Sequence, residues 1–286
     1  MASFGGDNPS RRSQIEMATV RGNSARAIFR ALACAALAPA CEPNLVVGTW
    51  SCPVGPRVEN DAGVLEPVTG PVASPWSTGF EQGLCDYYVA QGFCYGNPPA
   101  SFEIVDSPVH AGAHAAAFTI NTDMGDQVRC AREGTLPTDA YYGAWYYIPE
   151  LHDGVDNWNL FHFTGGEPGV TVPGLWDVTL ERLNPDDGKL HLFVRGPFGT
   201  GAQRPMDPVP IPIGSWFHIE FRLRRATDAT GLVQLFQDDQ LLVDLPGVQT
   251  ENTSSFGQWY VGNLANALTP PDSTVYVDDV TIRPAP

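Results

Sequence analysis

The chain has 286 residues, with 32 acidic against 16 basic side chains and a formal net charge of −16. Such an acidic protein repels polyanions, which argues against nucleic acid and anionic membrane surfaces as partners. Its 29 glycines and 26 prolines predict many turns, and a hydrophobic content of 43% is sufficient for one good core.

The N-terminal segment, residues 1–41, has the features of an export signal. Arginines lead into the apolar run AIFRALACAALAPAC, which ends in small residues and is too short for a permanent membrane span. Its end is similar to a bacterial lipobox, with Cys41 as the lipidated residue; the alternative is cleavage after Ala38 or Ala40. Met17 is an alternative start, which would leave residues 1–16 untranslated. We therefore expect an exported protein, extracellular or in the cell envelope, whose only membrane contact is a lipid anchor.

Residues 42–75 are rich in Pro, Gly and Val without a sustained period, which predicts a linker or arm. From Trp76 to the end at 286, short alternating runs are separated by turn sequences such as NPDDG, GPFGTG and TDATG. This pattern predicts a single all-β domain, an antiparallel two-sheet jelly-roll sandwich over residues 76–286.

Four cysteines remain if Cys34 leaves with the signal and Cys41 is lipidated. An even number in an exported chain favours two disulfides. The short loop between Cys85 and Cys94 makes them the easiest pair, which leaves Cys52 to bond Cys130. A zinc site is the competing interpretation, but the sequence contains no C-x-x-C.

An aromatic double strand, YYGAWYYI followed by NWNLFHF, is the most informative stretch of the chain. In the second run, alternation places Phe161 and Phe163 on one face and Trp158, Leu160 and His162 on the other. An imidazole beside an indole offers a place where a sugar stacks and a proton moves. The alternative is that these rings are simply core, as aromatic residues in strands usually are.

Three later strands each have an apolar face and a polar, decorated face: LWDVTLER, KLHLFVRG and SWFHIEFRLRR. A decorated sheet face of this kind is where a jelly roll binds glycans. Arg182, His191 and Arg195 belong to these strands, and we take them, with Trp158, as candidate polysaccharide-binding residues.

The order of these runs is similar to that of the concanavalin A-like lectin/glucanase superfamily. GFEQG with SFEIVDSPVHAGAHAAAFTI, PIGSWFHIEFRLR and VYVDDVTI carry this resemblance, which covers roughly residues 76–284. The span QVRCARE–YYGAWYYIPE–NWNLFHF further resembles the heparin lyase I-like polysaccharide lyases. Leu160 stands where that group carries the glutamine of its Q-x-H motif, and the sequence has no clear counterpart of the late Tyr/Lys strand motif of some relatives.

The resemblance implies cleavage of a uronate-containing glycan by β-elimination. Such a reaction removes the proton at C5, which requires a neutralised carboxylate, a base and a proton donor. The candidates are His162 as base, Tyr142 or Tyr146 as acid, and Arg129 or Arg132 as neutraliser. The two arginines are three positions apart, so a regular strand directs them to opposite faces and only one lines the cleft. The alternatives are a surface pair for Arg132 with Glu133, and an ordinary hydrogen-bonded role for His162.

The resemblance also implies a structural Ca²⁺ ion between the first and last strands, held by Glu81 and by Asp278 or Asp279. Carboxylates at these positions suit calcium, and an Asp on an apolar face is costly without a cation or backbone donors. The alternative is that one Asp is solvated and the other makes a turn contact. No organic cofactor is expected.

Two other functions stay open at this point. A non-catalytic, lectin-like carbohydrate-binding module of the same fold would use Trp158, Tyr146 and His162 as its platform. An envelope adhesion protein would use the fold without sugar, because fold alone does not fix function. Hydrolysis is disfavoured, since the chain lacks an E-x-D-x-x-E run and a G-x-S-x-G elbow. We expect a monomer.

Overall fold

A computed structural model of the chain describes residues 70–88, 91–166, 174–183, 186–252 and 256–286, with two further short strands at 44–47 and 50–53. The chain divides into two units, Met1–Cys41 and Glu42–Pro286. The predicted export segment, including Cys41, lies outside the described residues.

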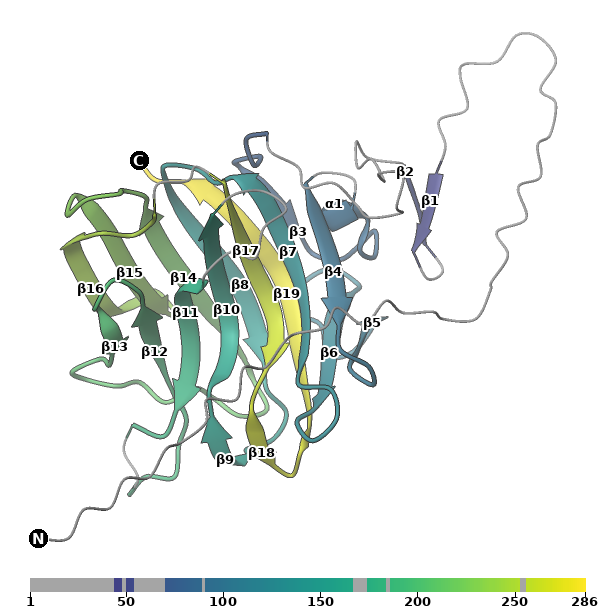
Figure 1. Cartoon of the computed structure of the whole chain (residues 1–286). Helices are drawn as coiled ribbons and strands as arrows, with labels where there is room; N and C mark the ends of the chain where they lie inside the picture. Colours follow the sequence, from purple (N-terminus) through teal and green to yellow (C-terminus); the bar gives the residue numbers. More distant parts are fainter. Residues whose placement is uncertain are drawn as a thin grey trace, which may run out of the picture. The chain divides into compact units, whose positions relative to one another are not determined.

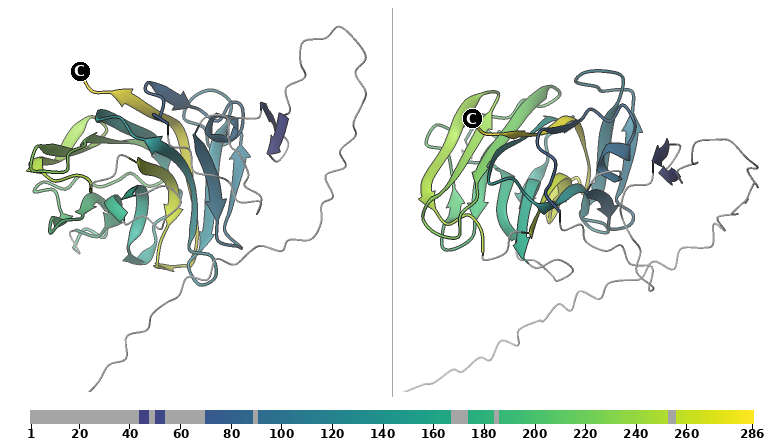
Figure 2. Two further views of the ribbon diagram at one scale, coloured as in Figure 1. Left: turned by 45° about the horizontal axis from the view of Figure 1, so that its top comes forward. Right: turned by 90° about the horizontal axis from the view of Figure 1, so that it is seen from above.

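Two antiparallel sheets face each other and form the predicted jelly-roll sandwich (Figures 1 and 2). The seven-stranded sheet has the order β13 (Gly201–Gln203), β12 (His191–Gly196), β11 (Gly174–Glu181), β10 (Trp158–Gly166), β17 (Phe256–Leu264), β7 (Gln127–Thr135), β4 (Gly92–Gly96). The eight-stranded sheet has the order β16 (Gln240–Val248), β15 (Gly231–Gln237), β14 (Trp216–Arg224), β8 (Asp139–Tyr147), β19 (Asp272–Pro284), β6 (Ala115–Asn121), β5 (Ser101–Val105), with β3 (Trp76–Thr78) paired to β19.

The smaller elements lie outside these two sheets. Strand β1 (Asn44–Val47) pairs with β2 (Trp50–Pro53), and β9 (Asp153–Asp156) pairs with β18 (Ala267–Thr269). A single turn of helix, α1 (Cys85–Tyr88), precedes β4. In the part of the chain that the structure describes, no helix has the length and apolarity to cross a lipid bilayer.

The core between the sheets is strongly aromatic, because both inner faces take the apolar half of each alternating strand. Burying such rings supplies most of the driving force for folding, and their edge-to-face contacts add to it. The fully buried aromatic side chains of the two sheets include Phe118, Tyr142, Tyr146, Trp158, Phe161, Trp176, Phe217 and Phe221.

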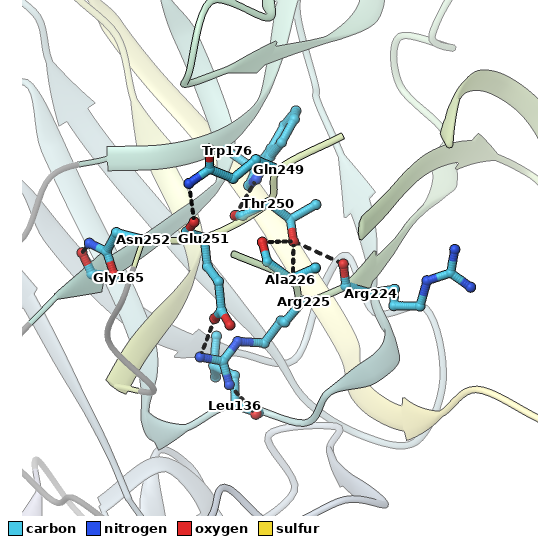
Figure 3. Close-up of polar contacts among 10 residues, drawn as sticks. All are labelled: Leu136, Gly165, Trp176, Arg224, Arg225, Ala226, Gln249, Thr250, Glu251 and Asn252. Atoms are coloured by element: carbon cyan, nitrogen blue, oxygen red, sulfur yellow. Dashed lines mark hydrogen bonds and ion pairs between the residues drawn. The ribbon is translucent and has the colours of Figure 1, made fainter. Parts of the chain in front are cut away.

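One end of the sandwich is closed by a polar cluster that ties the two sheets together (Figure 3). Trp176 of β11 donates its Nε1–H to the carbonyl of Thr250 at 2.8 Å, and the Thr250 hydroxyl donates to the carbonyl of Arg224, at the end of β14, at 2.9 Å. Arg225 pairs with Glu251 at 2.5 Å, and both side chains are little exposed. The segment after β16 therefore joins both layers at this end.

Candidate active site

Polar side chains form a continuous row across the outer face of the seven-stranded sheet. The backbone register pairs Arg195 of β12 with Asp177 of β11, Asp177 with His162 of β10, and His162 with Tyr260 of β17. Two residues beyond Tyr260 on β17, Gly262 lies opposite Arg129 of β7. Residues directly opposite on one face of a sheet are within contact distance, so the register alone brings a base, an acid and a cation together.

His162 is held by a carboxylate on the neighbouring strand. Its Nδ1 lies 2.5 Å from Oδ1 of Asp177, and the side chains of His162 and Asp177 are 21% and 26% exposed. A carboxylate only accepts, so the imidazole donates Nδ1–H to it and carries its lone pair on Nε2. A histidine fixed in this way presents one basic nitrogen to a substrate.

Asn159 brings an amide to the same face and joins the histidine pair to an arginine. Its Nδ2 donates to Asp177 Oδ1 at 2.6 Å, and its Oδ1 accepts from Arg129 Nη2 at 3.1 Å. Both Asn159 and Arg129 are buried at the floor of this surface. The sequence predicts no role for Asn159, because a regular strand would turn it away from His162.

A β-bulge in β10 places Asn159 on the same face as His162. Asn159 pairs with Thr179 of β11 and Phe161 pairs with the next residue, Val178, so Leu160 is the extra residue. A bulge of this kind reverses the alternation on one side of the insertion. The bulge thus places the amide of Asn159 on the same face as His162 and Asp177.

Tyr260 is the tyrosine that the structure places beside His162. The two ring centroids are 5.4 Å apart, the Tyr260 hydroxyl donates to Gln258 Oε1, and Arg129 lies 5.8 Å from the phenol ring centroid. Burial raises the pKa of Tyr260 well above its ordinary value, so the phenol holds its proton at neutral pH. This residue is absent from the sequence-based candidates, although the alternation of QWYVGN places Gln258 and Tyr260 on the face opposite Trp259 and Val261.

Two further rings lie on the far side of Tyr260. Phe93 and Tyr95 of β4 each have a ring centroid 6.2 Å from that of Tyr260. Tyr95 is paired in register with Arg129, and burial raises the pKa of its phenol. These rings give the polar surface an apolar wall against which a sugar ring can stack.

The prediction that Tyr142 or Tyr146 lines the cleft with His162 is wrong. Both are completely buried between the sheets, and burial raises the pKa of both phenols. The prediction relied on consecutive strands being neighbours, but β8 belongs to the eight-stranded sheet and β10 to the other one. The connection crosses between layers, and the Tyr146 hydroxyl reaches across the core to the Leu160 carbonyl at 2.9 Å.

Trp158 is also a core residue rather than part of a binding platform. The bulge that turns Asn159 outward turns Trp158 inward, where it is fully buried and donates Nε1–H to Asn263 Oδ1 at 2.9 Å. The predicted grouping of Trp158 with His162 on one face is therefore wrong. The alternative, that the aromatic rings of this stretch are core, holds for Trp158, Phe161 and Phe163.

Of the two candidate arginines, Arg129 reaches the polar surface and Arg132 does not. They face opposite ways, as their spacing requires. Arg132 is fully buried with its guanidinium 4.4 Å from the ring centroid of Trp76, and burial lowers its pKa to about 10. Glu133 is buried as well, so an exposed surface pair of Arg132 and Glu133 is excluded.

The other predicted polysaccharide-binding residues, Arg182, His191 and Arg195, lie in different places. Arg195 lies in the row with Asp177 and is partly exposed. His191 is buried next to Pro210, with which it forms a β-bridge, and burial lowers its pKa. Arg182 is bound to Asp153 at 2.5 Å and to the His152 carbonyl at 3.1 Å, so it anchors a loop. Only Arg195 of these three joins the row that contains His162.

The observed disulfide links Cys94 to Cys130. The predicted pairs Cys85–Cys94 and Cys52–Cys130 are therefore wrong, although Cys85 is also disulfide-bonded. Cys94 and Cys130 lie directly opposite each other on β4 and β7, a register that the sequence does not reveal. The bond adjoins the pair formed by Tyr95 and Arg129.

The three predicted calcium ligands lie around the loop at 110–114. Asp278 is fully buried and accepts from the backbone N–H groups of His110 at 2.9 Å and Ala111 at 3.2 Å, while Glu81 accepts from Ala113 at 2.8 Å. A Cβ at Gly79 would lie 3.3 Å from Asp279 Oδ1 and 3.6 Å from Asp278 Oδ1. Among the described residues, no group of three or more His, Cys, Asp or Glu side chains is placed to hold a metal by itself.

Comparison with solved structures shows that carbohydrate-active proteins share this jelly-roll fold. An endo-β-1,4-glucuronan lyase from the fungus Trichoderma reesei matches with a TM-score of 0.56 and 16% identity, over 74% of this chain and 96% of that one. An alginate lyase from Aplysia kurodai matches with a TM-score of 0.53 and 11% identity, over 75% of this chain and 100% of that one. A sialidase matches with a TM-score of 0.50 and 10% identity, over 77% of this chain and 19% of that one.

These identities are low, so the likeness establishes the fold, and activity must be argued from the site. No protein-family model and no curated protein matches the chain.

Proposed function

We propose that the protein is a polysaccharide lyase that cleaves a uronate-containing glycan by β-elimination on the outer face of the seven-stranded sheet. The observation that carries this proposal is the row in which His162, bound to Asp177 at 2.5 Å, lies next to Tyr260, with Arg129 alongside. The fold shared with a glucuronan lyase and an alginate lyase supports it.

The reaction needs a cation for the uronate carboxylate, and Arg129 supplies it. Neutralising that carboxylate makes the neighbouring C5–H acidic enough to be removed. Arg129 is largely buried, and its guanidinium is oriented by Asn159. A desolvated, oriented cation binds a carboxylate more strongly than an exposed one does.

His162 then takes the C5 proton on Nε2. The electron pair of the C5–H bond forms the C4–C5 double bond, and the bond from C4 to the glycosidic oxygen breaks. Tyr260 donates its phenolic proton to the leaving oxygen. Because the pKa of Tyr260 is raised, the phenol is protonated before the reaction and can act as the acid. Transfer of this one proton from Nε2 of His162 to the tyrosinate, directly or relayed by solvent, restores both groups.

The second candidate function is non-catalytic glycan binding at the same surface. The rings of Phe93, Tyr95 and Tyr260 favour it, because they form an apolar wall beside polar groups. Binding without turnover would need no proton donor, however, and the pairing of a fixed histidine with a protonated tyrosine favours catalysis.

Export and a structural calcium ion are part of the same proposal. The Cys94–Cys130 disulfide and the bonded Cys85 suit an oxidising compartment, in agreement with the signal-like N-terminus. Asp278, Asp279 and Glu81 would hold Ca²⁺ together with carbonyl or water oxygens. Burial and the charge of Asp279 raise the pKa of Asp278, and a cation at this place would stabilise its charged form. We also expect the protein to be a monomer.

Incubation of the protein with a panel of uronate polymers and neutral glycans tests the function. A lyase gives chain ends that absorb in the ultraviolet through the new double bond, and each unsaturated product is one water lighter than the corresponding hydrolysis product. Retention of a glycan on the protein with no product would select the binding function. Products that carry an added water would contradict the elimination.

A further inference from the structure

The base and the carboxylate-binding arginine of the proposed site are joined by a chain of hydrogen bonds. Arg129 Nη2 donates to Asn159 Oδ1 at 3.1 Å, Asn159 Nδ2 donates to Asp177 Oδ1 at 2.6 Å, and His162 Nδ1 lies 2.5 Å from the same Oδ1. The chain connects β7, β10 and β11, with β17 between β10 and β7.

Each link in this chain has a single possible direction. The guanidinium is only a donor and the carboxylate is only an acceptor, so Asn159 must direct its oxygen to Arg129 and its nitrogen to Asp177. For the same reason the proton shared by His162 and Asp177 belongs to Nδ1 when the ring is neutral. Both ends of the Asn159 amide are thus engaged within the protein.

Asp177 is the neighbour of His162 that determines which nitrogen of the neutral imidazole carries the proton. Tyr260 of β17 contacts the imidazole with its ring, while its hydroxyl is bonded to Gln258. Arg195 of β12 pairs with the far side of Asp177, and Arg129 of β7 reaches it through Asn159. Among the described residues, Asp177 is the anionic side chain that contacts the His162 ring directly.

We propose that Asp177, oriented by Asn159, is a positioning residue that keeps the Nε2 lone pair of His162 available and in register with Arg129. This role rests on the proposed function, but the protonation of the imidazole can be measured without substrate. Such a carboxylate does not touch the sugar; it acts through the histidine, as the aspartate of a catalytic triad does.

Asp177→Asn is the direct test, because the asparagine has nearly the same shape. An amide that donates to Nδ1 moves the ring proton to Nε2 and removes the basic lone pair. Nitrogen NMR of the free, full-length protein should show neutral His162 protonated on Nδ1 in the wild type and on Nε2 in the variant. kcat should fall on the order of 10⁴-fold, as for a triad aspartate, with a smaller change in KM.

Two other variants complete the test. Glu181→Gln is the matched control: Glu181 lies on the same face of β11, is paired with Arg204 at 2.7 Å, and should leave the His162 ring and kcat unchanged. Asp177→Glu keeps a carboxylate and should keep the Nδ1 proton, with partial recovery of kcat.

The outcomes separate this inference from the proposed function. Wild-type His162 protonated on Nε2, or a folded Asp177→Asn variant that retains the Nδ1 proton and full kcat, would overturn the positioning role. If the Asp177→Asn variant does not fold, the spectra of the wild type and of the Asp177→Glu variant still test the positioning role of Asp177. A wild type with the expected ring proton but no elimination product on any glycan would refute the proposed lyase and leave the assignment of Asp177 standing.

Discussion

Replacing Tyr260 by Phe isolates the proton donor of the proposed reaction. The ring contacts with His162, Phe93 and Tyr95 remain, and the variant loses one hydrogen bond, from the hydroxyl to Gln258. Such a bond contributes about 1 kcal/mol to stability, so the fold should persist. General acid catalysis contributes about 10²- to 10⁴-fold, equivalent to about 2.7–5.4 kcal/mol of the barrier, and kcat should fall by this factor.

The assay is the initial rate of double-bond formation, followed by ultraviolet absorbance on the most responsive uronate polymer, with KM and the urea midpoint measured in parallel. Tyr142→Phe is the matched control. The Tyr142 hydroxyl is buried without a hydrogen-bond partner among the described residues, so its removal should keep kcat and leave stability equal or higher. Full activity of the Tyr260→Phe variant would refute the assignment of Tyr260 as the proton donor. Loss of activity in the Tyr142→Phe variant alone would refute it as well.

Three further predictions concern stability. Cys94→Ser should lower the free energy of unfolding by roughly 4 kcal/mol on the chain-entropy model, given the separation of 36 residues, and a urea midpoint close to that of the wild type would contradict this. A chelator should lower the melting temperature of the wild type and not that of Glu81→Gln if calcium is bound at Glu81 and Asp278; equal shifts would exclude the site. Burial lowers the pKa of His191, so the unfolded state binds its proton first and stability is lost as the pH falls below about 6.5. His191→Gln should therefore show a smaller loss of urea midpoint from pH 7.5 to 5.5, and an unchanged loss would show that His191 does not contribute.

Much of the architecture follows from alternation in the sequence. In β11, β12 and β14 the predicted apolar face is buried, as for Trp176, Leu192 and Phe217. Where a strand is regular, one apolar face suffices to fix its orientation. The sandwich, its antiparallel strands and the side that carries Asp177 are therefore predictable from local pattern.

The active-site candidates depended on facts that local pattern does not contain. The bulge at Leu160 exchanges the faces of Trp158 and Asn159, and nothing in NWNLFHF marks its position. The crossing from β8 to β10 separates Tyr146 from His162 by a full layer, although only a short connection joins the strands. Tyr260 reaches His162 from a strand nearly a hundred residues later, a long-range pairing of the kind that the order of strands determines.

Comparison of the wild type with His162→Ala on one uronate oligosaccharide tests the central claim most directly. Double-bond formation is followed by absorbance, and binding is followed by calorimetry on the same samples. We expect the wild type to form the unsaturated product and the variant to bind the oligosaccharide with similar affinity while forming none. Equal rates of product formation by both proteins would contradict the claim that His162 is the base of a lyase on this sheet.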